Sequence, residues 1–184
     1  MFDYSKCNQN QILDLYAFNL LRQNCNRMFY PCWIRSKEKD VLNCSFLNDN
    51  IRVLCPNLNI INKANETNSP NLISYVLSVN HGLSKIILGG DAENESWNHI
   101  VENYKDEIAN ATILKASHHG RDSGYHQEAV KTINPFVTVV SVGKKPETDA
   151  SNKYRQYSNY VFSTVWQGSM VFDCYEDGTV IMLN

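Results

Sequence analysis

The sequence predicts a layered α/β domain with a mixed sheet, and two observations support this prediction. Short apolar runs alternate with amphipathic helical segments through the second half of the chain. Such alternation is typical of strands that share one sheet with helices packed against it. The chain has 184 residues, a length that fits one domain with a sizeable core. We therefore expect residues 1–184 to form a single domain.

The first part of the chain predicts four segments in order. Apolar residues at helical spacing predict a helix over 10–24. Residues 27–36 form a short β-like run that contains Pro31, which favours an edge position. Two short strands are expected within 43–56, on either side of an Asn-Asp-Asn turn. Residues 57–70 are rich in asparagine and are predicted to form a loop.

The rest of the chain predicts a regular succession of elements. A hairpin is expected over 71–90, with its turn at His81-Gly82. Helices and strands then alternate: an amphipathic helix in 93–110, a buried strand in 111–117, a helix in 124–134, a second buried strand in 135–143 and a short helix in 149–158. Three closing strands are expected in 159–165, 168–178 and 179–184.

Composition and charge exclude several classes of protein. Hydrophobic residues make up 43% of the chain and charged residues 20%, as in globular proteins. The formal net charge of -2 provides no global basic field for nucleic acid, although a local basic patch remains compatible with it. The start of the chain has no apolar signal core, and no run is long enough for a membrane helix. We therefore expect a cytoplasmic protein whose six scattered cysteines are reduced.

The first candidate site is the sequence Gly89-Gly90-Asp91. It follows the apolar run 86–88, so the carboxylate is expected at the C-terminal end of a strand. The glycines let the backbone pass close to a group that the carboxylate holds. Asp91 could instead be the N-cap of the next helix.

The second candidate site is Ser117-His118-His119-Gly120, again at the end of a predicted buried strand. Neutral imidazole is a common zinc ligand, although an isolated histidine pair is more often structural or exposed to solvent. Asp91 and the histidine pair follow neighbouring strands of one βαβ-like unit. Their side chains can therefore converge at the sheet edge where α/β proteins tend to bind ligands.

Three segments in this order resemble the C-terminal half of metallo-β-lactamase-fold hydrolases. They are "IILGGDAE", "ATILKASHHGRDSGYH" and "INPFVTVVSVGKK". The resemblance covers roughly residues 10–183, and the hydrolase-like domain of the competence DNA-uptake protein is the most similar group. It implies half of a four-layer αββα sandwich, with a mixed sheet and helices on one face.

The resemblance also implies roles for individual residues. Asp91 matches the aspartate that bridges two metal ions, and His119 matches the last histidine ligand, with His118 as the alternative. The other histidine of the pair would contact substrate or orient its neighbour. Zinc is the implied metal, with manganese or iron as alternatives. A site with two ions activates water for hydrolysis, and the bridging carboxylate suits that chemistry.

Two departures from the family pattern matter. The family's main metal motif, H-x-H-x-D-H, does not occur in this sequence. The segment before Asp91 contains a single histidine, His81, which we expect at a turn. His99 and His126 are expected at the surface, although His126 could approach a substrate. We therefore expect one of two situations. Either another polypeptide, or self-association, supplies the N-terminal half, or the chain is a truncated or degenerate copy of the fold.

The second departure follows the strand at 135–143. Relatives of the competence type carry His-Pro-His there, and this chain has Asp149 and Ser151 instead. Nearby basic residues could contact phosphate, or could be ordinary surface charges: Lys144, Lys145, Lys153 and Arg155. Arg121, directly after the histidine pair, is a better placed phosphate contact.

These observations support a phosphodiesterase or nuclease hypothesis. Asp91, His119 and Arg121 are the candidate catalytic residues, and nucleic acid or a nucleotide is the candidate substrate. The candidate substrate-binding residues are Arg121, Lys144, Ser141 and Asp149. The competing hypothesis is a non-catalytic binding or scaffold subunit that keeps the fold. A plain α/β domain with coincidental motifs is the third alternative.

Overall fold

A computed structural model describes residues 8–9, 50–144 and 148–183. The predicted helix over 10–24, the β-like run 27–36 and the first strand within 43–56 lie outside the described residues. Four of the six cysteines do so too, whereas Cys55 and Cys174 are both free thiols. Within the described part, no helix is long and apolar enough to cross a membrane.

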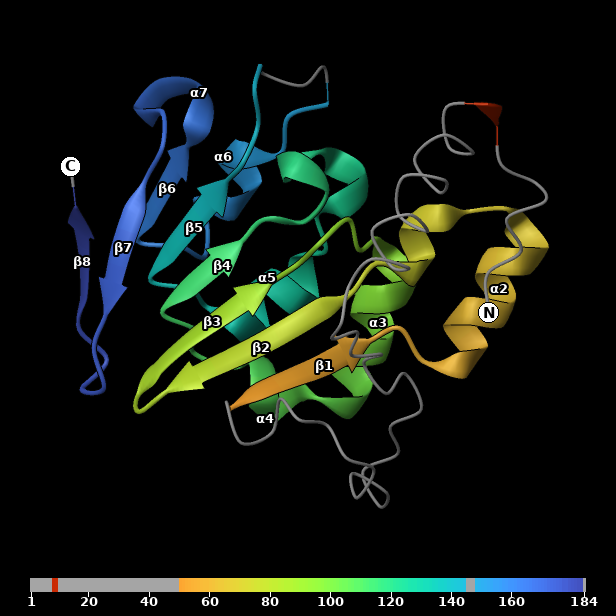
Figure 1. Cartoon of the computed structure of the whole chain (residues 1–184), viewed down its shortest axis with the longest axis horizontal. Coiled ribbons are helices and arrows are strands. Elements are labelled where there is room, and N and C mark those ends of the chain that lie inside the picture. Colours follow the sequence, from red (N-terminus) through yellow and green to blue (C-terminus); the bar gives the residue numbers. More distant parts are fainter. Residues whose placement is uncertain (1–7, 10–49, 145–147, 184) are drawn as a thin grey trace, which may run out of the picture.

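The described residues form an α/β fold around a mixed six-stranded sheet (Figure 1). Its strands lie side by side in chain order: β1 (Ile51–Cys55), β2 (Val76–His81), β3 (Ser84–Leu88), β4 (Ile113–Lys115), β5 (Val137–Val140) and β6 (Tyr160–Ser163). The first three are antiparallel neighbours, whereas β3 to β6 are parallel. A separate antiparallel hairpin closes the chain, with β7 (Val171–Cys174) and β8 (Val180–Leu183).

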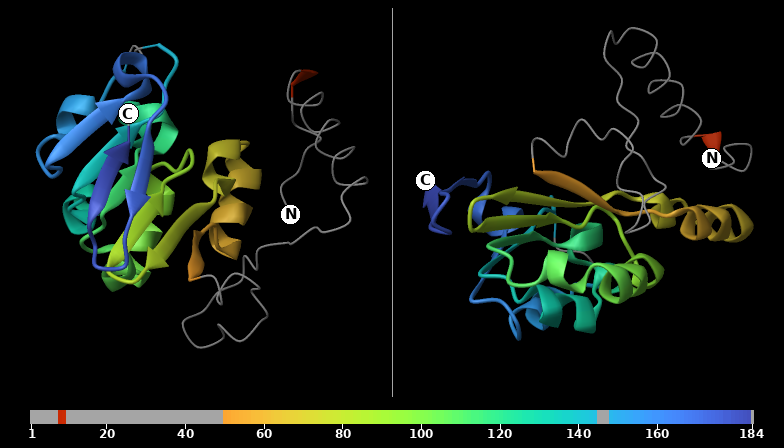
Figure 2. Two further views of the ribbon diagram at one scale, coloured as in Figure 1. Left: turned by 60° about the vertical axis from the view of Figure 1, so that its left-hand side comes forward. Right: turned by 90° about the horizontal axis from the view of Figure 1, so that it is seen from below.

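Helices and short turns connect these strands. The α-helices are α2 (Leu58–Thr67), α3 (Asn94–Asn103), α4 (Lys105–Ile108), α5 (Gln127–Ile133), α6 (Ser151–Tyr154) and α7 (Thr164–Gln167). The 3-10 turns are η2 (Pro70–Ile73), η3 (Ser117–Gly120) and η4 (Asp122–Gly124). Figure 2 shows α3, α4 and α5 together on one side of the sheet.

The main core lies between the sheet and these helices. Strand pairing aligns one row of side chains across the sheet, and each is at most 9% exposed: Ser78, Ile87, Leu114, Thr138 and Val161. Ile87 and Leu114 pack with Ile100 of α3 and Ile133 of α5 in one cluster. The apolar helix faces, predicted from a period of 3.6 residues, therefore pack against the apolar strand face, predicted from a period of two residues.

The opposite face of the sheet is also apolar, and no described helix covers it. The row Leu77, Leu88, Lys115, Val139 and Phe162 lies on this face. Leu88 is 37% exposed and Tyr160 is 53% exposed. The β7–β8 hairpin packs on one end of the face, where the rings of Phe172 and Phe162 lie 6.4 Å apart. We call this surface the helix-free face.

Two local predictions were wrong. Residues 57–70, expected to be a loop, contain the helix α2. The Asn57 side chain caps it by accepting a hydrogen bond from the Ile60 amide at 2.9 Å, and Ile60, Ile61 and Ala64 are buried. Capping and burial of this apolar stripe outweigh the poor helix propensity of asparagine. The helix expected over 93–110 is interrupted at Tyr104, whose φ of -133° is not helical.

Candidate metal centre

Asp91 follows the predicted strand β3, separated from its last residue, Leu88, by Gly89 and Gly90. Its backbone amide donates to the Ser74 hydroxyl at 3.0 Å. Gly90 before it has a φ of +53°, and an added Cβ would lie 2.6 Å from the Tyr75 carbonyl oxygen. Asp91 is not the cap of α3, because Glu93 occupies the N-cap position and makes no side-chain cap bond. The Asp91 carboxylate is therefore available for another role.

The two histidines after β4 share an uncommon backbone conformation. His118 has a φ of 46° and His119 a φ of 56°, so both lie in the left-handed region. This conformation costs a non-glycine residue about 1–2 kcal/mol. Strain of this kind tends to persist at functional sites, where the surrounding structure imposes it.

Three contacts impose the histidine conformation. The buried Ser117 hydroxyl donates to the Gly89 carbonyl at 3.1 Å, and the His118 amide donates to the Gly90 carbonyl at 2.9 Å. Gly124 packs so closely that an added Cβ would lie 2.7 Å from the His118 Cβ. The loop after β3 and the loop after β4 are therefore joined into one unit.

This unit brings His119 to Asp91. The His119 Nε2 and Asp91 Oδ1 atoms lie 3.9 Å apart. The His119 Nδ1 atom lies 2.7 Å from the Ser141 carbonyl oxygen, which only accepts hydrogen bonds. Nδ1 therefore donates to this carbonyl, and Nε2 is the ring nitrogen close to the Asp91 carboxylate. A carbonyl that fixes the tautomer in this way is a common partner of metal-binding histidines.

The donor atoms fit a zinc ion. Imidazole nitrogen and carboxylate oxygen are both zinc ligands, at about 2.0–2.2 Å from the metal. Around a tetrahedral zinc ion two such donors lie about 3.4 Å apart, so the His119 and Asp91 side chains, at 3.9 Å, would have to approach each other by about 0.5 Å to bind the same ion. His119 is 49% exposed and Asp91 is 40% exposed at the side chain, so an ion has access to both.

His118 points to a different carboxylate. Its Nδ1 atom lies 3.2 Å from Glu93 Oε1 and 2.8 Å from the Ser123 hydroxyl. Sequence reasoning did not identify Glu93 as a member of the site. The sequence shows that Glu93 lies two residues after Asp91. Its proximity to His118 depends on the backbone conformation of the loops after β3 and β4, which the sequence does not show. The described site thus contains two pairs, Asp91 with His119 and Glu93 with His118.

Arg121, Lys144 and Ser141 lie around the same histidine. His119, Arg121 and Lys144 line one cavity of about 420 Å³, together with Val142 and Gly143. Arg121 and Lys144 are both exposed, and Ser141 supplies the carbonyl that orients His119. Three of the four predicted substrate-binding residues therefore surround the candidate ligand.

Asp149 lies nearby in the backbone but its side chain is engaged elsewhere. Residues 121 and 149 form an antiparallel bridge. The Asp149 carboxylate accepts hydrogen bonds from the Ser151 amide and hydroxyl, so it organises the start of α6. Lys153 pairs with Asp122 at 2.9 Å and does not join Arg121 at the cavity.

The other three histidines lie away from the pair. His81 is exposed at the end of β2, beside the predicted turn. His126 caps α5, because its Nδ1 accepts from the Ala129 amide at 3.1 Å. Burial lowers the pKa of His126 and also that of His99, which is partly buried rather than freely exposed.

No group of three or more histidine, cysteine, aspartate or glutamate side chains within the described ranges is arranged to hold a metal ion. The sequence matches no protein-family model, and no curated protein is significantly similar to it. The functional argument therefore depends on the geometry of the described side chains.

Proposed function

We propose that this chain is the C-terminal part of a metal-dependent hydrolase of the metallo-β-lactamase type, which cleaves phosphodiesters of nucleic acid or nucleotides. One observation carries the proposal: the His119 Nε2 and Asp91 Oδ1 atoms lie 3.9 Å apart, while His119 Nδ1 donates to the Ser141 carbonyl. Asp91 and His119 would hold the metal, with His118 and Glu93 beside them. Zinc suits these donors best, and manganese or iron accept a similar set.

The bound metal supplies an acidified water and a positive charge for hydrolysis. The chain's own residues bind and orient the substrate beside it. Arg121 and Lys144 line the cavity next to His119, where two cations can stabilise the charge on phosphate oxygens. This placement favours a phosphodiester over an uncharged ester or amide.

The proposal includes a second polypeptide or a second copy of this chain. The four side chains of the two described pairs are too few for a closed binuclear site, because each tetrahedral zinc ion takes three or four protein ligands. The helix-free face is apolar and partly exposed, and an apolar face that no described helix covers favours association. A second sheet packed there would complete a four-layer αββα sandwich and supply the remaining ligands.

The proposal is tested by hydrolysis of bis(p-nitrophenyl) phosphate with added zinc. The chain is assayed alone and together with the polypeptide encoded immediately upstream. We expect activity only in the combined sample, and its loss in Asp91→Asn. Equal activity of wild-type protein and Asp91→Asn would refute the proposal, as would an inactive combined sample that contains stoichiometric zinc.

A non-catalytic binding or scaffold subunit is the second candidate function. It is favoured by the lack of a three-ligand group among the residues that the structure describes. An upstream reading frame without an H-x-H-x-D-H motif would favour this alternative. In that case Asp91→Ala would leave partner binding unchanged.

A further inference from the structure

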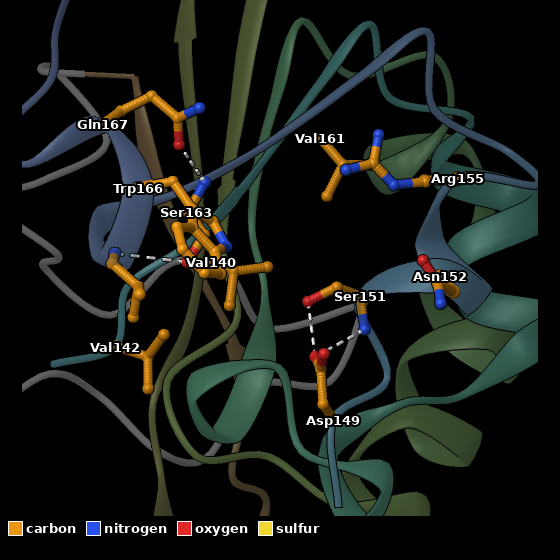
Figure 3. A pocket seen from close by; sticks show the side chains of 11 residues that line it. Val140, Val142, Asp149, Ser151, Asn152, Arg155, Val161, Ser163, Trp166 and Gln167 are labelled. Atoms are coloured by element: carbon orange, nitrogen blue, oxygen red, sulfur yellow. Dashed lines mark hydrogen bonds between the residues drawn. The ribbon is translucent and has the colours of Figure 1, made fainter. Parts of the chain in front are cut away.

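A second pocket lies beside the candidate metal centre, between α6 and the connection of β6 to α7 (Figure 3). Its volume is about 210 Å³. Val142 lines both this pocket and the cavity that contains His119, Arg121 and Lys144, so the two hollows adjoin. A substrate held at His119 can therefore extend into the second pocket.

One wall of the pocket supplies unused hydrogen-bond donors. Figure 3 shows Asn152 and Arg155 on this wall. Both side chains are exposed, and neither has a hydrogen-bond or ion-pair partner among the described residues. The pocket's carboxylate, Asp149, is engaged by the amide and hydroxyl of Ser151. The free guanidinium can therefore bind an anionic oxygen in a bidentate manner.

The opposite wall supplies an aromatic surface. Trp166 of α7 is 77% exposed although it lines the pocket. Beside it, the Gln167 side-chain oxygen accepts from the Ser163 amide at 2.9 Å, which leaves the Gln167 amide N–H groups for a ligand. Four valines also line the pocket: Val140, Val142, Val161 and Val165.

We propose that this pocket binds one nucleoside of the phosphodiester substrate, with its base against Trp166 and a flanking phosphate at Arg155. An indole face, valine side chains and a cation suit a planar base that carries a phosphate. Whole ligands occupy pockets of about 300–1,000 Å³, so a pocket of about 210 Å³ fits one unit of a longer substrate. The choice of ligand rests on the proposed phosphodiester chemistry.

The test is calorimetric titration of the full chain with adenosine 5′-monophosphate (AMP) in the absence of zinc. Arg155→Ala and Trp166→Ala are compared with wild type. Lys131→Ala is the matched control, because Lys131 is an exposed cation in the last turn of α5, which leads to the start of β5. Both test residues are exposed, so circular dichroism is expected to be the same for all four proteins.

We expect AMP affinity to fall about tenfold in each test variant and to stay at the wild-type value in Lys131→Ala. Inorganic phosphate is expected to bind more weakly than AMP. Unchanged affinity in Arg155→Ala or Trp166→Ala would overturn the proposal, as would AMP that binds no better than phosphate. This titration measures no hydrolysis. AMP binding by the chain, found together with an inactive combined sample that contains stoichiometric zinc, would refute the proposed function and leave this subsite standing.

Discussion

Gly120, directly after the histidine pair, is a position where a single added methyl group should damage the candidate site. Its φ is +74°, and an added Cβ would lie 2.7 Å from Val140 Cγ1 and 3.3 Å from Val140 Cγ2. Val140 is a buried β5 residue, so its side chain has little room to move. The left-handed backbone costs about 1–2 kcal/mol and overpacking about 1–3 kcal/mol, which predicts a loss of about 2–5 kcal/mol for Gly120→Ala.

Urea denaturation of the full chain measures this loss. Gly143→Ala is the control, because an added Cβ there meets nothing within 4 Å. We expect the control to change the free energy of unfolding by less than about 1 kcal/mol. In a Val140→Ala background the packing conflict disappears, so Gly120→Ala should then cost only about 1–2 kcal/mol. A cost below about 0.5 kcal/mol in the wild-type background would refute this account of the histidine loop.

Two further predictions concern the helix caps. Asn57→Ala removes the hydrogen bond to the Ile60 amide and should lower the free energy of unfolding by about 1 kcal/mol; an unchanged urea midpoint would contradict the cap. Burial lowers the pKa of His126 in the folded protein, whereas in the unfolded chain it is about 6.5. Above about pH 6.5 the cap contributes its full stability. As the pH falls below about 6.5 the unfolded chain takes up a proton that the folded protein does not, so this stability is lost. The melting temperature should therefore decline between pH 7 and pH 5, and more gently in His126→Asn; identical slopes for both proteins would contradict this.

The succession of strands and helices along the second half of the chain was the most predictable part of the fold, because local patterns specify it. The hairpin at His81-Gly82 and the strand that ends before Asp91 are confirmed. Helix α2 was not predictable from its asparagine-rich sequence, since a cap at Asn57 and contacts of Ile60 with the core stabilise it. In this segment tertiary contacts stabilise a helix although the local helix propensity is poor.

The candidate site was predictable only in outline. The sequence placed Asp91 and His119 at the ends of neighbouring strands, and β3 and β4 are indeed paired in parallel. The pairing of His118 with Glu93 was not predictable, because it depends on left-handed backbone at both histidines. The orientation of His119 depends on the Ser141 carbonyl, 22 residues away along the chain. Every residue has a backbone carbonyl, so the sequence does not show which carbonyl a histidine will contact.

Zinc binding by the full chain tests the central claim, that Asp91 and His119 hold one metal ion. Zinc is titrated against a coloured competing chelator with wild type, Asp91→Ala, His119→Ala and the control His81→Ala, whose histidine is exposed at the far end of β2. The account predicts a zinc site in wild type and in His81→Ala that is lost in Asp91→Ala and in His119→Ala. Equal zinc binding by all four proteins would contradict the assignment.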